Sequence, residues 1–274
     1  MRTATYFQVR SDSLLLYELP LEHKGRRHNL QMNNQKTYSG KVTPHARKRL
    51  RKALDILVQK TELHYVNNPF TEKKMPFRMG FITLTIALEK NLKVRESYET
   101  LLSKWLRTMK RKQGMKRYVW KAEYQRRGQV HYHLMTDTFL DARTISSEWN
   151  KLQKNAGYLK NFALRNGHFK PPSTHVRSAI DLGEINAYVA KEMCKGVQNQ
   201  KTTPGKIWDC STDLKIDRYS DFLTSEMESL IDDAIQHGFA EVVESEHCTI
   251  IKTDSPDLLL SSSDKVNYHK YIRA

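Results

Sequence analysis

Hydrophobic and polar positions recur along this chain with two different spacings, which predict its helices and strands. Apolar residues at helical spacing predict helices over 43–61, 95–112, 142–155 and 181–195, and one more over 221–238. Short runs rich in β-branched and aromatic residues predict five strands, over 77–89, 115–125, 129–137, 173–180 and 205–214. A further short hairpin is predicted over 241–252, whereas 1–40 give no clear pattern. Between 77 and 214 the order is strand, helix, strand, strand, helix, strand, helix, strand, which favours an α+β fold with an antiparallel sheet.

Two of the predicted helices begin with recognisable capping residues. Thr43 precedes Pro44, a residue that suits the first position of a helix. Asp181 is followed three residues later by Glu184, the spacing of a capping box. We therefore expect helices to start at these two points.

Charge is distributed unevenly, and this divides the chain. The 274 residues carry a net charge of +16. Residues 217–274 hold 5 Lys and Arg against 12 Asp and Glu, whereas 1–216 hold 41 against 18. We predict a basic N-terminal extension over 1–75, which could also belong to the main domain, a main domain over 76–216 and an acidic C-terminal region over 217–274. So basic a body is expected to bind a polyanion, most commonly nucleic acid.

Cysteine usage and hydropathy point to the cytoplasm. The three cysteines, Cys194, Cys210 and Cys248, form no CxxC pair, so they support neither a zinc knuckle nor a disulfide framework. The first residues lack the apolar core of a signal peptide, and no apolar run is long enough to span a bilayer. A soluble protein without membrane contact is expected.

The stretch "KAEYQRRGQVHYHLMTD" (121–137) carries the strongest candidate chemistry. The connection "RRG" has Gly128 at its third position, where a three-residue hairpin loop favours a left-handed residue. That loop pairs Glu123 with His131 and leaves His133 one step along the same face. Two imidazoles and one carboxylate with open positions are typical of a catalytic metal site, although two histidines can also share a strand face by chance. We expect cleavage to fade below the ordinary histidine pKa of about 6.5.

Basic residues border this predicted site, and a tyrosine downstream is a candidate nucleophile. Lys121, Arg126 and Arg127 are predicted to hold DNA phosphates, although a charged turn can simply be solvated. Tyr188 and Lys191 adjoin on the predicted helix over 181–195, and Lys195 projects from the same side. A nearby lysine and a metal ion both favour attack by a phenol on phosphorus.

The spacing Tyr-x-x-Lys alone does not select Tyr188. It also occurs at Tyr38–Lys41 and Tyr118–Lys121. Tyr38 falls in a loop-like segment, and Tyr118 lies on the opposite strand face from the predicted ligands. By itself, Tyr188 could equally be a half-buried helix residue beside a solvated lysine.

Three motifs in order resemble those of the HUH endonuclease superfamily: "FITLTIA", "EYQRRGQVHYH" and "YVAK". Histidines before the tyrosine, and one tyrosine rather than two, resemble the single-tyrosine replication initiators (Rep). The flanking "PPSTHVRSAIDLGEINAYVAKEMCKG" and "IWDCS" also look like initiators of rolling-circle plasmids and single-stranded DNA phages. The resemblance covers about 77–215 and does not reach the acidic C-terminal region.

The resemblance implies a fold, a cofactor and a reaction. The fold would be a five-stranded antiparallel sheet flanked by helices, of the ferredoxin or RRM-like type. Glu123, His131 and His133 would hold Mg²⁺ or Mn²⁺, Tyr188 would be the nucleophile and Lys191 its helper. The reaction would nick single-stranded DNA at an origin through a 5′-phosphotyrosine link, and a second transesterification would rejoin it. Because no GxxxxGK motif is followed by Ser or Thr, a host helicase and polymerase are expected partners.

Three other functions fit parts of this pattern. A transposase or relaxase-like enzyme would use the same chemistry on different DNA. A non-catalytic single-strand binder would need only the basic sheet and its aromatic residues. A zinc hydrolase would use the same three ligands, but the basic body argues against it.

Overall fold

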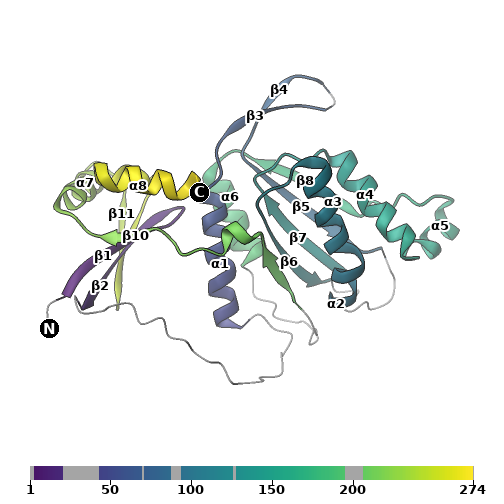
Figure 1. The fold of residues 1–274 in the computed structure, drawn as a ribbon, viewed down its shortest axis with the longest axis horizontal. Coiled ribbons are helices and arrows are strands. Elements are labelled where there is room, and N and C mark those ends of the chain that lie inside the picture. The colour runs from purple at the N-terminus through teal and green to yellow at the C-terminus, as the bar shows by residue number, and fades with distance from the viewer. Residues whose placement is uncertain are drawn as a thin grey trace. The chain divides into compact units, whose positions relative to one another are not determined.

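A computed structural model describes residues 3–20, 43–69, 71–87, 94–125, 128–194 and 206–273. The chain divides into two compact units, which are described separately here (Figure 1). The terminal unit contains Met1–Lys36, Val58–Lys60 and Ile216–Ala274. The central unit contains Thr37–Leu57 and Thr61–Lys215. Both ends of the chain therefore belong to one unit.

The central unit is built on a five-stranded antiparallel sheet of order β8-β5-β7-β6-β9. The strands alternate apolar and polar side chains, so each side of the sheet has its own character. Their bounds are β5 Met79–Thr85, β6 Tyr118–Tyr124, β7 Val130–Thr136, β8 Thr174–Ala179 and β9 Trp208–Cys210. The α+β class and the five-stranded antiparallel sheet are thus confirmed.

One side of this sheet carries the main core. The predicted helix over 95–112 is present as α2 (Val94–Ser97), a π-helical turn η1 (Tyr98–Leu102) and α3 (Ser103–Gln113), and α4 spans Ala142–Asn155. Trp105 of α3 and Trp149 of α4 pack with Trp120 and Tyr132 of the sheet, and all four are almost fully buried. A short helix that the sequence did not predict, α5, spans Lys160–Asn166. Burial of these rings supplies much of the driving force for folding this unit.

The opposite side of the sheet carries the other helices of the central unit. Helix α1 spans Pro44–Gln59, and its residues up to Leu57 belong to the central unit. Helix α6 spans Leu182–Tyr188 and continues into a π-helical turn, η2 (Val189–Met193). Both predicted caps are present: Ala46 N donates to Thr43 Oγ1 at 3.1 Å, and Glu184 N donates to Asp181 Oδ1 at 2.9 Å.

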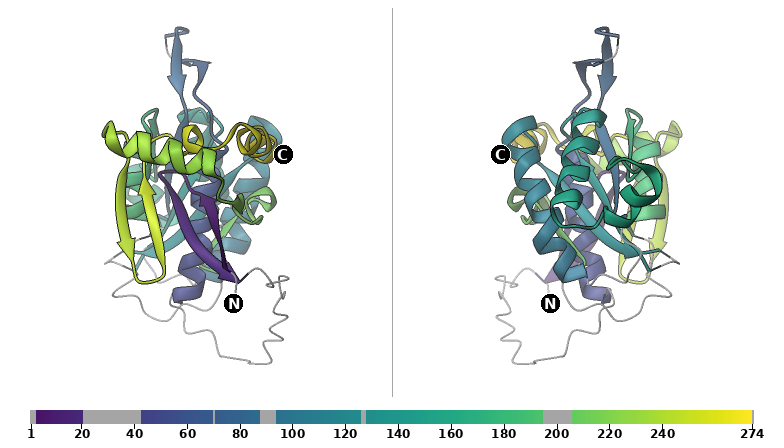
Figure 2. Two further views of the ribbon diagram at one scale, coloured as in Figure 1. Left: turned by 90° about the vertical axis from the view of Figure 1, so that its left-hand side faces the viewer. Right: turned by 90° about the vertical axis from the view of Figure 1, so that its right-hand side faces the viewer.

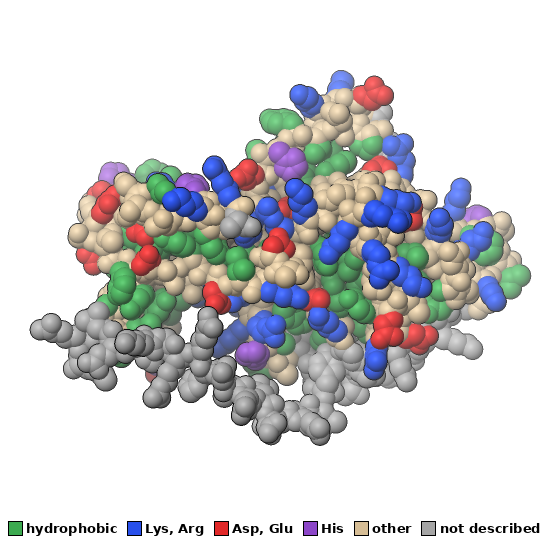
Figure 3. All heavy atoms as spheres, in the orientation of Figure 1, with side chains coloured by type: hydrophobic (Ala, Val, Ile, Leu, Met, Phe, Trp, Pro, Cys, Tyr) green, Lys and Arg blue, Asp and Glu red, His purple; other side chains and the backbone are tan. Residues whose placement is uncertain are grey.

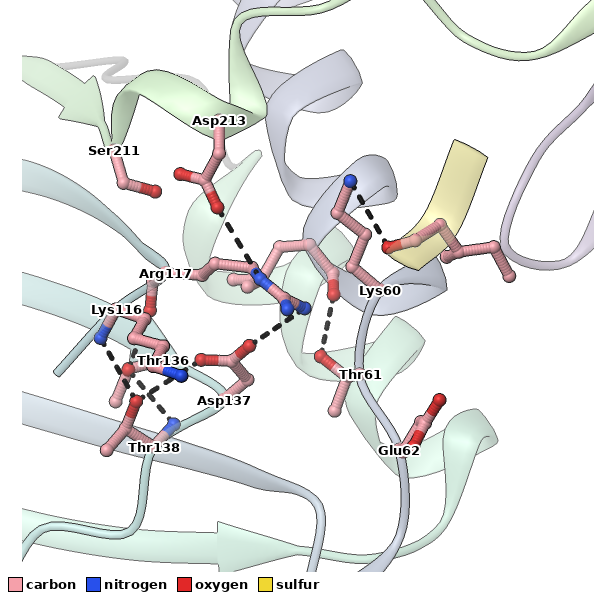
Figure 4. A network of polar contacts seen from close by, with 12 residues as sticks. Lys60, Thr61, Glu62, Lys116, Arg117, Thr136, Asp137, Thr138, Ser211 and Asp213 are labelled. Carbon is pink, nitrogen blue, oxygen red and sulfur yellow. Dashed lines mark hydrogen bonds and ion pairs between the residues drawn. The ribbon is translucent and has the colours of Figure 1, made fainter. Parts of the chain in front are cut away.

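Two smaller features complete the central unit. Strands β3 (His64–Asn67) and β4 (Lys74–Phe77) pair only with each other among the described residues, and Figure 2 shows this hairpin standing out from its unit. Arg117, directly before β6, pairs with Asp137 at 3.2 Å and with Asp213 in η3 (Thr212–Leu214) at 3.5 Å (Figure 4). These ion pairs hold the end of β7 and the segment after β9 against the start of β6.

The terminal unit contains a second five-stranded antiparallel sheet, of order β10-β1-β2-β12-β11. Its strands are β1 Thr3–Val9, β2 Ser13–Pro20, β10 Ser220–Phe222, β11 Glu241–Ser245 and β12 Cys248–Lys252. Helices α7 (Ser225–Gln236) and α8 (Ser262–Arg273), with the turn η4 (Pro256–Leu259), complete the unit. Phe7, Leu14 and Ile251 from the sheet pack with Met227 of α7 and Tyr268 of α8.

This sheet divides the chain differently from the charge pattern. The pattern separated 1–75 from 217–274, whereas β1 and β2 pair directly with β10 and β12. Strands β1 and β2 were not predicted, because their buried residues alternate over a polar N-terminal sequence whose partners lie more than 200 residues away. The helix and hairpin predicted after 217 are confirmed as α7 and β11–β12.

Candidate functional site

The β6–β7 hairpin has the register that its sequence predicts. Gly128 has φ 80°, its N–H donates to Gln125 O at 2.8 Å, and Gln125 N donates to Gln129 O at 2.8 Å. Glu123 consequently pairs with His131. A left-handed residue is tolerated here because glycine has no Cβ. Of the turn residues predicted to hold DNA, Arg126 and Arg127 lie outside the described residues.

Cross-strand pairing gathers polar side chains in two adjacent rows on one side of the sheet. Partners in antiparallel strands point to the same side, so register alone places them together. The first row contains Trp208, Lys121, His133, Thr83 and His175, from β9 through β6, β7 and β5 to β8. The second row contains Glu123, His131 and Thr85. This is the side on which α1 and α6 lie, opposite the tryptophan-rich core.

Glu123 is held as a carboxylate by two neighbours. Lys121, only 1 % exposed, pairs with Glu123 Oε1, and His133 Nε2 lies 3.4 Å from Glu123 Oε2. Burial alone raises the pKa of Glu123, but hydrogen bonds with His133 and Lys121 and the charge of Lys121 outweigh it and lower the pKa to about 2. The Lys121 ammonium also donates to Glu192 O at 3.1 Å. Lys121 therefore joins the carboxylate strand to the turn η2.

His131 is neutral at physiological pH. Burial, followed by the charge of His133, lowers the pKa of His131 to about 4. Its ring lies 3.3 Å from Thr85 Oγ1 and 3.4 Å from Gln125 Nε2. The loss of metal binding expected below pH 6.5 therefore does not apply to His131, because desolvation disfavours its protonated form.

The chemistry of these donors fits a divalent cation, although their arrangement does not yet form a closed site. Metal ions bind ionised carboxylates and neutral imidazoles, the forms in which Glu123 and His131 are held. His133 Nδ1 is buried without a partner among the described atoms, so this ring is not committed to a structural hydrogen bond there. Within the described ranges, however, no three His, Cys, Asp or Glu side chains lie close enough to share one ion. Binding of Mg²⁺ or Mn²⁺ by Glu123, His131 and His133 stays a prediction.

Tyr188 lies over the same side of the sheet. It ends α6 immediately before the π-helical turn, and its ring stacks on Phe81 of β5 with 4.1 Å between centroids. Burial, followed by the charge of Glu192, raises the pKa of Tyr188 to about 12, while Arg177 and a hydrogen bond with Thr83 act in the opposite direction. Phenol and carboxylate are close enough for Glu123 also to raise this pKa. Turns of this π type occur frequently at functional sites.

A cavity of about 310 Å³ brings the phenol and one predicted ligand together. Its lining comes from β5, β7, β8, α6 and η2: Phe81, Thr83, His133, His175, Arg177, Glu184, Ala187, Tyr188, Lys191 and Glu192. Lys191 is exposed on this lining. Because η2 has the wider π spacing, Lys191 is not placed beside Tyr188 as a regular helix would place it, and no described contact joins them. Lys195 lies outside the described residues.

Sequence reasoning missed two residues of this cavity, His175 and Arg177. Both belong to β8, where they alternate onto the same side as Thr83 and Phe81. Arg177 pairs with Glu184 at 3.0 Å and is the cation that lowers the pKa of Tyr188. The alternation of "THVRSA" gave the signal, but only the pairing with β5 shows which side faces the tyrosine.

Comparison with known proteins points to one class. Residues 79–197, less than half of the chain, match the family described as replication-associated protein ORF2 or gene 2 protein. The matched segment contains Glu123, His131, His133, Tyr188 and Lys191. The match supports a rolling-circle replication initiator, a class that acts in DNA replication of plasmids and phages and binds single-stranded DNA at an origin. No curated protein and no solved structure matches the chain. No described helix is both long and apolar enough to cross a bilayer.

Proposed function

We propose that the central unit nicks and rejoins single-stranded DNA at a replication origin, with Tyr188 as the nucleophile. The observation that carries this proposal is the placement of Tyr188 over the row of polar residues that includes His133 and Thr83. A phenol that shares a cavity with an imidazole and two cations, Arg177 and Lys191, is suited to attack a phosphodiester. The family match supports the same reaction class.

In the proposed step, Tyr188 Oη attacks the phosphorus of one phosphodiester. The new Oη–P bond replaces the bond from phosphorus to the 3′ oxygen, and the phenolic proton is transferred, in net terms, to that leaving oxygen. The products are a 5′-phosphotyrosine link and a free 3′-OH, which can prime a polymerase. Because the link is itself a phosphodiester, attack by a later 3′-OH reverses the step without ATP.

The charged residues around the phenol have separable roles in this proposal. Arg177 already lowers the pKa of Tyr188 and would stabilise negative charge at the reacting phosphate. Lys191, exposed on the cavity lining, would attract the phosphate and offset charge in the transition state. Lys121 is buried and paired with Glu123, so it would position the carboxylate rather than touch DNA.

Glu123, His131 and His133 would hold Mg²⁺ or Mn²⁺ in this proposal. When bound, the ion would polarise the phosphate oxygens and so lower the barrier to attack. The lowered pKa of Glu123 and of His131 keeps both donors ready for a cation without loss of a proton. Movement of the Lys121 ammonium away from Glu123 would accompany binding, because two cations cannot share one carboxylate oxygen without repulsion.

The proposed partners follow from this reaction. The substrate would be single-stranded DNA at an origin in the cytoplasm of a bacterial host cell. Because the sequence has no nucleotide-binding helicase motif, unwinding and synthesis would come from host enzymes.

The test is covalent capture. The protein is incubated with Mn²⁺ and a randomised pool of labelled single-stranded oligonucleotides, and the products are separated on denaturing gels. A labelled protein band in wild type that is absent in Tyr188→Phe and in chelator supports the proposal, and sequencing of the captured strands gives the cleavage site. Retention of DNA on native gels with no covalent band would instead support a non-catalytic single-strand binder. Captured strands that match transposon ends rather than an origin would favour a transposase.

A further inference from the structure

A second cavity lies in the central unit, apart from the tyrosine cavity. It has a volume of about 360 Å³ and lies between α1 and the segment 206–215, at the β9 edge of the sheet. Its floor is apolar and buried, formed by Ala53, Ile207, Cys210 and Leu214. No residue of this cavity belongs to the tyrosine cavity or to the predicted metal ligands. It therefore needs its own explanation.

The rim of this cavity is basic. Arg49, Lys52, Lys206 and Lys215 line it together with His45, against the single carboxylate of Asp209. Asp209 binds two of these cations: Lys206 Nζ lies 2.6 Å from Oδ2 and Lys215 Nζ 3.2 Å from Oδ1. Figure 3 shows Lys and Arg side chains gathered over α1 and the segment that follows β9. One carboxylate thus fixes two ammonium groups side by side, while the cavity as a whole keeps an excess of positive charge.

An indole completes the lining. Trp208 is half-buried, whereas Trp105, Trp120 and Trp149 are almost fully buried, so Trp208 is the accessible member of the four tryptophans of the chain. Trp208 pairs with Lys121, which pairs with His133, so all three point to the same side of the sheet. At the usual spacing between strands, Trp208 lies about 10 Å from His133 along this row. The cavity therefore lies on the same side of the sheet as the candidate site.

An apolar floor, an accessible indole and paired cations match the parts of a nucleotide. A base stacks on an aromatic ring regardless of its identity, and its phosphate binds ammonium and guanidinium groups. A neutralising role for Lys206 and Lys215 alone accounts for Asp209, but it leaves Arg49 and the exposed indole unexplained. We propose that this cavity is a second subsite for single-stranded DNA, which holds a nucleotide away from the reacting phosphate. The proposal rests on the proposed function, because that function supplies the single strand.

The first experiment uses the intrinsic fluorescence of the tryptophans. Tyr188→Phe protein, which cannot form the covalent link, is titrated with oligothymidylates from about 4 to about 16 nucleotides long. We expect binding to quench the fluorescence in wild-type and Tyr188→Phe protein alike, and we expect Trp208→Phe to remove most of the quenching. Quenching of equal size in Trp208→Phe, or oligonucleotide binding by anisotropy with no quenching in wild type, would overturn the subsite. The wild-type titration does not depend on how any variant folds.

The second experiment removes charge in two matched ways. The cleft variant is Arg49→Ala with Lys206→Ala and Lys215→Ala. The control is Lys104→Ala with Arg107→Ala and Arg111→Ala, three exposed residues of α3 on the other side of the sheet. For the longer oligonucleotides, we expect the cleft variant to bind at least about tenfold more weakly, and its plot of log affinity against log salt to be shallower by about 2. The control should match wild type, and a cleft variant that matches the control would overturn the proposal.

Failure of this inference can be told apart from failure of the proposed function. If the subsite is wrong but the function is right, covalent capture at Tyr188 persists while neither Trp208 nor the rim cations affect binding. If the function is wrong but the subsite is right, quenching and salt effects persist without any covalent band. Wild-type protein that binds no single-stranded DNA would overturn both proposals.

Discussion

The phenol ring of Tyr188 lies against the ring of Phe81, with 4.1 Å between ring centroids and 25° between the planes. Phe81 is almost fully buried in β5, so it is a rigid surface for the tyrosine. Two residues further along β5, Thr83 lies in the row that contains His133 and His175. This stacking fixes the tyrosine above the polar rows without requiring any bond to its hydroxyl.

Tyr188→Phe should abolish covalent attachment to DNA and leave affinity for single strands within about threefold, since the variant keeps the ring and loses only the nucleophile. Peptide mapping of the DNA-linked protein gives the direct check. Tyr124→Phe, a change of the same kind in β6, serves as the control and should react normally. A DNA link at Tyr118, which is buried under the Lys110 ammonium, or at Tyr38, which lies outside the described residues, would refute the assignment.

Lys121→Met should slow covalent attachment about tenfold or more and lower the free energy of unfolding by about 2 kcal/mol. The reason is that the buried ammonium makes charge-assisted hydrogen bonds to Glu123 and to the carbonyl of Glu192. Single-turnover kinetics and urea unfolding measure the two effects. Lys112→Met breaks an exposed pair with Glu148 and should cost less than about 1 kcal/mol without slowing the reaction. Equal effects of the two changes would count against a positioning role for Lys121.

Stability should depend on pH through Glu123. Its pKa is lowered from 4.5 to about 2 in the folded protein, so the carboxylate stabilises the fold above pH 4.5, and this stabilisation is lost as pH falls towards 2. In metal-free protein, Glu123→Gln should therefore unfold more easily at pH 7, by on the order of 3 kcal/mol, with a gap that narrows towards pH 3. Urea titrations at several pH values in chelator measure this. A gap of constant size would contradict the assignment.

Removal of the metal ligands should abolish nicking. The double variant His131→Ala, His133→Ala should lose Mn²⁺ binding by calorimetry and covalent attachment on gels, whereas His175→Ala should keep metal binding. Because the pKa of His131 is lowered to about 4, protonation of this ring should not limit Mn²⁺ binding at pH 5. Full activity of the double variant in chelator would exclude a role for the ion.

The terminal unit supports a prediction about truncation. A chain that ends at 216 keeps β1 and β2 but loses β10 and β12, the strands that pair with them, so Phe7 and Leu14 lose their apolar cover. It should aggregate or bind a hydrophobic dye. A chain that also lacks 1–20 should stay soluble and nick single strands, since the acidic unit is not proposed to touch DNA. A soluble chain of this kind that fails to nick would show that the terminal unit takes part in the reaction.

Local sequence was sufficient for the elements around the candidate site. Gly128 in a three-residue turn determined the hairpin register, and hence the pairing of Glu123 with His131, because side chains alternate strictly along strands. The caps at Thr43 and Asp181 similarly determined where α1 and α6 begin. These features depend on neighbours within a few residues, and for that reason the sequence by itself predicted them.

Only the tertiary structure decided what depends on contacts between distant segments. The pairing of β1 and β2 with the C-terminal strands, the burial of Lys121 under Glu192, and the stacking of Tyr188 on Phe81 join residues far apart in the chain. The π-helical turn after Tyr188 likewise changed the spacing that placed Lys191 beside it. Periodicity shows which side of an element is polar, but packing decides which other element meets that side, because burial and charge pairing are set by all the neighbours together.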